Sequence, residues 1–256
     1  METLESSEFY DRLAKAFDLM TDWDSRLAHE MPFLQQTLER HGARSVLDAA
    51  CGTGWHAIAL AQKGYRTAGC DASPVMIEQA RANASKARVP VRFEVAGFVR
   101  MGVFSEIFDA VLCLGNSLPH LLSREALADA LAYMRARLHR GGVLILHNLN
   151  YDLRIKKQPR FFSANGHTKA LVWRFADYGP EYITFHTALF ERKLDGEKSS
   201  WSVQVNSTLQ RPLLEKDLDE ALDRAGFKEV RHYGGLDGSP FDCEKSGDLV
   251  VVAVAE

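Results

Sequence analysis

The 256-residue chain has no long hydrophobic run, no closely paired cysteines and no excess of charge of one sign. No apolar stretch reaches about 18 residues, so we predict no membrane-spanning segment. The four cysteines lie far apart without a CxxC pair, which disfavours a disulfide framework and favours a reducing, cytoplasmic setting. With 31 basic and 34 acidic residues, the net charge is −3, so we predict no nucleic-acid partner.

The sequence also lacks the short motifs that mark metal and triphosphate sites. Its nine histidines show no HxxxH or HExxH spacing, and no Cys/His ligand pattern is present. A Walker loop is absent, because Lys63 lies too far along the chain from Gly52 and Gly54. We therefore expect neither a metal ion nor P-loop chemistry.

The order of the predicted elements indicates an α/β fold with a Rossmann-like, seven-stranded sheet, helices on both faces and an inserted antiparallel β unit. Strands of the main sheet are predicted at residues 45–48, 65–70, 91–95, 108–114, 143–147, 227–233 and 248–253. Helices are predicted at residues 7–20, 26–40, 55–63, 124–138 and 212–225, and another opens at Ser73 and Pro74. We expect Pro32 to interrupt the second helix near its start.

The pattern changes after residue 150. Residues 156–166 are expected to form an exposed loop. It comes with a basic cluster made up of Arg154, Lys156, Lys157 and Arg160. Long strands that alternate apolar and polar residues are predicted at residues 170–176, 182–192 and 201–210. Asp195 and Gly196 signal a hairpin between the last two strands.

A glycine-containing loop follows the first strand, in the segment VLDAACGTG at residues 46–54. Gly52 and Gly54 let the backbone approach a ligand closely, and the next helix adds free N–H groups. The pattern G-x-G-x-x-A from Gly52 matches a dinucleotide fingerprint, and Asp71 is spaced to bind a ribose diol. The Asp48 carboxylate would repel a pyrophosphate bound on this loop, whereas it would attract a cationic amine. S-adenosylmethionine, which has a ribose, a sulfonium and an amino-acid tail, fits this charge.

These residues resemble the class I S-adenosylmethionine-dependent methyltransferases. VLDAACGTG followed by CDASPVM at residues 70–76 carries the likeness. The resemblance is closest to the glycine/sarcosine N-methyltransferase-like group, through GNSLPHL at residues 115–121, NYD at residues 150–152, and the pair Ser25 and Arg26.

The resemblance implies a set of cofactor contacts. Asp71 binds the ribose hydroxyls, and the Leu114 carbonyl accepts from the cofactor amine. Tyr10 and Arg26 close over its carboxylate. Met76, Gly97 and Phe98 surround the adenine, where Phe98 stacks because it cannot accept a hydrogen bond. The remaining cofactor-binding candidates are Asp48, Ala50, Gly52, Gly54 and Ala72.

The acceptor side departs from this group at one position. Glycine methyltransferases carry Arg before Asn-Tyr-Asp to pair with the substrate carboxylate, and this chain has Leu149. Leucine cannot form that bidentate contact, so the acceptor lacks a carboxylate there or uses another cation, such as Arg174. The catalytic candidates are His120, as general base, and Asn116, which orients the acceptor. The substrate-binding candidates are Asn116, His120, Asn148, Tyr151 and Arg174.

We therefore predict methyl transfer from S-adenosylmethionine to a small molecule, at an amine nitrogen, by in-line displacement. The alternatives are a sugar-amine N-methyltransferase, a small-molecule O-methyltransferase, a nicotinamide-dependent oxidoreductase and a non-catalytic cofactor-binding module. The sequence is also compatible with a homo-oligomer. The predicted division is a helical cap at residues 1–44, a cofactor-binding domain at 45–150 and 213–256, and an insertion at 151–212 that covers the acceptor site.

Overall fold

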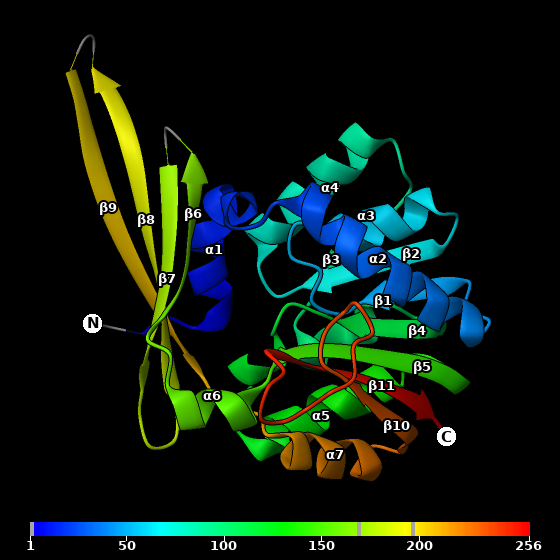
Figure 1. Cartoon of the computed structure of the whole chain (residues 1–256). Helices are drawn as coiled ribbons and strands as arrows, with labels where there is room; N and C mark the ends of the chain where they lie inside the picture. The colour runs from blue at the N-terminus through cyan, green and yellow to red at the C-terminus, as the bar shows by residue number, and fades with distance from the viewer. Residues whose placement is uncertain (1–2, 168–169, 196–197) are drawn as a thin grey trace.

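Two separate β-sheets organise the chain, as the computed structural model shows for residues 3–167, 170–195 and 198–256 (Figure 1). The seven-stranded sheet has the order β10-β11-β5-β4-β1-β2-β3. Its strands are β1 (Ser45–Asp48), β2 (Arg66–Asp71), β3 (Arg92–Val95), β4 (Phe108–Cys113), β5 (Leu138–Leu149), β10 (Phe227–Tyr233) and β11 (Asp248–Ala255). The neighbouring strands from β5 to β3 pair in parallel, whereas β11 pairs antiparallel with both β5 and β10. This architecture confirms the predicted fold class.

Helices cover both faces of this sheet (Figure 1). One face carries α2 (Trp23–Arg40), α3 (Trp55–Gln62) and α4 (Pro74–Ala87), and the other carries α5 (Arg124–Arg135) and α7 (Glu215–Arg224). Local sequence explains where two of them begin. The Ser73 hydroxyl accepts the Met76 N–H at 3.0 Å with Pro74 in the first turn, and the Ser123 hydroxyl accepts the Ala126 N–H at 3.0 Å.

Helix α2 runs unbroken through Pro32, so the predicted interruption was wrong. The helix begins earlier than expected, where the Asp22 carboxylate accepts the Ser25 N–H at 3.2 Å. A proline inside a helix costs about 3 kcal/mol. Leu34 and Leu38 are both fully buried against the sheet, and that burial offsets the cost.

The second sheet is antiparallel, with the order β6-β7-β8-β9. Its strands are β6 (Phe161–His167), β7 (Ala170–Tyr178), β8 (Ile183–Asp195) and β9 (Lys198–Gln210). Helix α1 (Ser6–Phe17) packs against one face of it, where Phe9 and Leu13 share a buried cluster with Val172 and Leu189 (Figure 1). The hairpin was predicted at Asp195 and Gly196. Asp195, the last residue of β8, is the strand-ladder partner of Lys198 at the start of β9, and Gly196 lies outside the described residues.

The predicted exposed loop at residues 156–166 was wrong, because this segment contains the end of α6 (Tyr151–Lys157) and most of β6. The Asn150 side chain caps α6 by accepting the Leu153 N–H at 3.3 Å. Arg154, Lys156 and Lys157 lie in the last turn of α6, where positive charge complements the helix dipole. Three of the four residues in the basic cluster therefore lie at the end of a helix.

The strand order reverses beside β1. From β1 the chain moves outward through β2 and β3, and it then returns to β4 on the other side of β1. The loops that follow β1 and β4 diverge at this point and leave a crevice, which is where open α/β sheets bind ligands. No helix in the described part of the chain is both long and apolar enough to cross a membrane. The domain boundaries given above stay predictions.

Candidate active site

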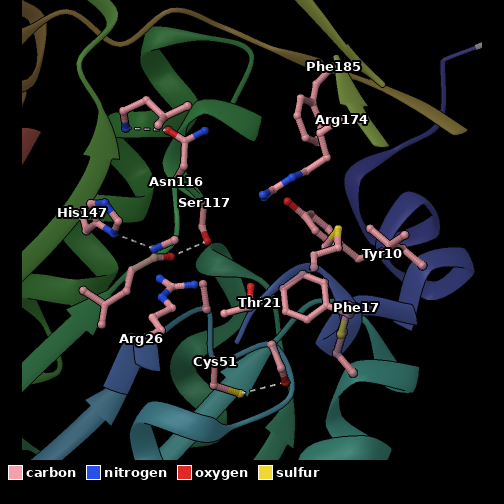
Figure 2. Close-up of a pocket in the computed structure, with 18 of the residues that line it drawn as sticks. Tyr10, Phe17, Thr21, Arg26, Cys51, Asn116, Ser117, His147, Arg174 and Phe185 are labelled. Atoms are coloured by element: carbon pink, nitrogen blue, oxygen red, sulfur yellow. Dashed lines mark hydrogen bonds between the residues drawn. The ribbon is translucent and has the colours of Figure 1, made fainter. Parts of the chain in front are cut away.

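A cavity of about 480 Å³ lies at this switch point, between the loops after β1 and β4, the N-terminal helices and the second sheet. Figure 2 shows side chains from all of these elements pointing into it. The predicted site residues that line it are Tyr10, Arg26, Ala50, Gly52, Asp71, Met76, Leu114, Asn116 and Arg174. The structure thus brings together residues that are as much as 164 positions apart (174 − 10).

Asp71 joins the end of β2 to the glycine loop. One carboxylate oxygen accepts the Gly52 N–H at 2.9 Å, and the other accepts the Ser73 N–H at 2.9 Å. Burial raises the pKa of Asp71, and these hydrogen bonds act in the opposite direction. Gly52 has a φ of +52°, and a Cβ there would lie 3.6 Å from the Phe17 ring. The carboxylate is therefore held rigidly at the cavity wall, with lone pairs left for ligand hydroxyls.

Asp48 and Gly54 lie beneath this surface and not on it. Gly54 has a φ of +86°, and a Cβ there would come within 2.7 Å of the Phe93 ring, so this glycine allows α3 to pack closely on the sheet. Asp48 is 2% exposed and accepts the Ala50 N–H at 3.4 Å. Burial raises the pKa of Asp48 to about 7. The cofactor-binding roles of both residues stay predictions.

Arg26 is anchored on the cavity wall by a buried carboxylate. Its Nε donates to Glu30 Oε1 at 2.8 Å, and His56 Nε2 donates to Glu30 Oε2 at 2.6 Å. Burial alone would raise the pKa of Glu30, but the His56 hydrogen bond and the Arg26 charge outweigh it and lower the pKa to about 2. The guanidinium carbon of Arg26 lies over the Trp23 ring, 5.0 Å from its centroid. With Nε held, the two Nη groups are left for a ligand anion.

Tyr10 lines the cavity and contacts His120, which does not line it. The Tyr10 hydroxyl lies 3.1 Å from His120 Nε2, and the amide nitrogen of Gln210 lies 3.4 Å from the same atom. Because two donors meet Nε2, we place the ring proton on Nδ1. Burial lowers the pKa of His120 to about 4, so the ring is neutral near pH 7. Burial also raises the pKa of Tyr10, which keeps its hydroxyl protonated.

The loop after β4 is shaped by backbone in the left-handed region. Gly115 and Asn116 have φ values of +73° and +66°. The Asn116 amide oxygen accepts the Leu149 N–H at 3.0 Å, and its nitrogen donates to the Tyr151 hydroxyl at 3.0 Å. Ser117 donates to the Leu114 carbonyl at 2.9 Å, which leaves one lone pair of that oxygen for a ligand. Asn116 is therefore a fixed part of the wall.

Several predicted residues do not line the cavity: His120, Asn148, Tyr151, Ala72, Gly97 and Phe98. Asn148 was expected to face the cleft, but strand alternation along β5 turns His147 and Leu149 toward it. Tyr151 is fully buried and donates to Gln210 Oε1 at 3.1 Å, so it supports the wall from behind. Ala72 and Gly97 lie near each other, and Phe98 packs on the core.

Sequence reasoning missed several lining residues, among them Glu30, His147, Ser163 and Gln210. Glu30 carried a detectable signal, because it lies four residues after Arg26 on one helix face. His147 could have been found from strand alternation beside Leu149. Ser163 and Gln210 lie on strands of the second sheet, and only the tertiary packing brings them here.

Known proteins match this chain over most of its length. Residues 46–142 match the family model of the methyltransferase domain. The chain is 31% identical over 233 residues to a glycine/sarcosine N-methyltransferase from Aphanothece halophytica, which covers 89% of this chain and 83% of that protein. It is 35% identical over 230 residues to a glycine/sarcosine N-methyltransferase from Parasynechococcus marenigrum, with coverages of 89% and 78%.

A solved structure shows the same fold. The S-adenosylmethionine-bound amino pentose methyltransferase from Micromonospora echinaspora matches with a TM-score of 0.68 at 20% identity, covering 100% of both chains. The fold and the resemblance predicted from the sequence are thus confirmed. On the identity and coverage of the two curated relatives, the chain belongs to the S-adenosylmethionine-dependent methyltransferases, in the family of the glycine/sarcosine N-methyltransferases.

Proposed function

We propose that this enzyme methylates an amine nitrogen of a small molecule, with the cofactor and the acceptor meeting in the cavity at the β1–β4 switch point. The observation that carries the proposal is that two different parts of the fold form the walls of this one cavity. Asp71 and the anchored Arg26 line the wall built by the main sheet and α2, while Arg174 and Gln210 come from the second sheet.

The cofactor wall offers a partner for each part of S-adenosylmethionine. We assign Asp71 to the ribose hydroxyls, the Leu114 carbonyl to the amine, and the Nη groups of Arg26 to the carboxylate. Met76, which lines the cavity and is 1% exposed, supplies an apolar contact for the adenine. When bound, the cofactor supplies a methyl group that is already activated by the sulfonium.

The protein contributes mainly alignment. Holding a neutral amine in line with the methyl group is worth about 7–11 kcal/mol of the barrier in favourable cases. Tyr10 and Asn116 line the cavity where the second sheet meets the β4 loop, and both are fixed by hydrogen bonds. We assign His120 to hold the Tyr10 hydroxyl. With a pKa of about 4 it is a weak base, so its part in the reaction runs through Tyr10.

An amino sugar is a second candidate acceptor, and Leu149 is the observation that favours it. This apolar side chain lines the cavity where the glycine methyltransferases are expected to place Arg. With leucine at this position, a glycine substrate would have no arginine to pair with its carboxylate. An amino sugar has no carboxylate and needs no such arginine.

Methyl transfer from isotope-labelled S-adenosylmethionine tests the proposal. The acceptors would be amino acids, simple amines, amino sugars and hydroxyl compounds of matched size, with mass spectrometry of the products. We expect label on nitrogen. Label on oxygen alone would replace the proposal with an O-methyltransferase. No transfer to any compound, with cofactor binding intact, would count against a small amine.

A further inference from the structure

Two arginines reach the cavity from the segment between β5 and α7 without a carboxylate partner in the described part of the chain. Arg174 on β7 donates through Nε to the Ser163 hydroxyl at 2.9 Å. Arg154 on α6 lies over the Phe162 ring, with its guanidinium carbon 4.3 Å from the centroid, and its Nη1 lies 3.5 Å from the Tyr178 hydroxyl. Both arginines line the cavity.

Two other basic residues of the same segment form ion pairs outside the cavity. Arg160 lies 3.2 Å from Asp177, and Lys156 lies 3.6 Å from Glu244. Neither lines the cavity.

The acidic groups of the cavity are already engaged. Glu30 is held by Arg26 and His56, and Asp71 accepts two backbone N–H groups. Burial lowers the pKa of Arg174, and the nearby Arg26 charge acts in the same direction. A desolvated cation without a counter-ion costs free energy, and a bound anion removes that cost.

Arg174 also lies on a different wall from the expected carboxylate site. At the end of β5, Leu149 offers no charge. In Figure 2 the Arg174 guanidinium extends from the second sheet toward Tyr10, with Arg26 on the other side of the cavity. The cofactor carboxylate has its own arginine, so Arg174 is left for the acceptor.

We propose that the methyl acceptor is an anionic amine whose carboxylate or phosphate group is bound by Arg174, with Arg154 as a second cation on the cavity lining. This rests on the function proposed above and names its substrate class. Arginine suits the role because its planar fork meets both oxygens of such an anion. The anion would be bound by residues beyond β5, and the amine would then point toward Tyr10 and the cofactor wall.

Anion binding to the cofactor-product complex tests this directly. Enzyme saturated with S-adenosylhomocysteine would be titrated with acetate and, separately, with inorganic pyrophosphate, and followed by ligand-observed NMR. We expect at least one anion to bind, and Arg174→Gln to weaken it about tenfold or more. Arg174→Lys should retain part of the affinity. Preference for acetate would indicate an amino-acid acceptor, and preference for pyrophosphate a nucleotide-linked amine.

Arg160→Gln is the matched control, because this arginine is on the same segment but pairs with Asp177 outside the cavity. Its anion affinity should equal that of the wild type. If neither anion binds the wild-type complex, or if Arg160→Gln weakens binding as much as Arg174→Gln, the proposal is overturned. Saturation with S-adenosylhomocysteine is measured first in the same samples, so failure of the cofactor assignment is seen separately.

Discussion

Replacing Glu30 by Gln tests how the structure prepares Arg26 for the cofactor carboxylate. Glu30 is 7% exposed and bonds Arg26 and His56 at 2.8 and 2.6 Å. These contacts lower its pKa from 4.5 to about 2, which corresponds to about 3 kcal/mol in favour of the ionised form. In Glu30→Gln, the single amide oxygen can accept from Arg26 or from His56 but not from both, and the negative charge that strengthens the Arg26 contact is lost. The guanidinium is then expected to be held less firmly in its place.

The expected result is weaker binding of S-adenosylhomocysteine. Charged hydrogen bonds contribute roughly 1.5–3 kcal/mol, so the dissociation constant should rise by about tenfold to 150-fold. The nucleoside 5′-methylthioadenosine lacks the amino-acid tail, and its affinity should change less than about twofold if only the Arg26 contact is affected. Calorimetric titration of both ligands against both proteins measures the difference.

The sign of the effect separates two explanations. If Glu30 acted only through its charge, its neutralisation would remove repulsion from the cofactor carboxylate and strengthen binding. Tighter binding of S-adenosylhomocysteine, or equal weakening of both ligands, would refute the positioning role. Glu39→Gln is the matched control, because Glu39 lies exposed in the last turn of the same helix. It should bind both ligands as the wild type does.

Three further predictions concern stability and the ribose site. The pKa of buried His120 is about 4 against 6.5 in the open chain, so stability should fall as the pH drops from 6.5 towards 4, by up to about 1.4 kcal/mol per unit. Urea unfolding of His120→Gln should show a flatter pH profile there, and an unchanged slope would contradict the assignment. Gly54→Ala should lower the melting temperature, because its Cβ would meet the Phe93 ring at 2.7 Å and φ is +86°; an unchanged value would show that the loop relaxes freely. Asp71→Ala should weaken cofactor binding, and unaltered binding would mean that the ribose site is misplaced.

Local rules account for the parts of the fold and site that the sequence predicted. Ser73 before Pro74 marks a helix start, and the apolar run of β4 marks a strand covered on both faces. Gly52 followed by Asp71 at the end of β2 lies at a switch point that topology rules place there. These features depend on neighbours in sequence or on strand order, so a single chain reveals them.

The missed features depend on tertiary packing. Pro32 lies within a helix because Leu34 and Leu38 are buried, and no local rule weighs that burial against the proline. His120 follows the β4 loop as expected, yet it does not line the cavity and instead contacts the hydroxyl of Tyr10, which lies on a helix more than a hundred residues away. Gln210 orients His120 from the second sheet, and its register there could not be predicted.

The central claim is that the switch-point cavity binds S-adenosylmethionine and not a nicotinamide dinucleotide. Calorimetric titration of the purified enzyme with S-adenosylhomocysteine, with NADH in parallel, tests it most directly. We expect micromolar binding of S-adenosylhomocysteine alone. Binding of NADH alone, or of neither ligand, would contradict it.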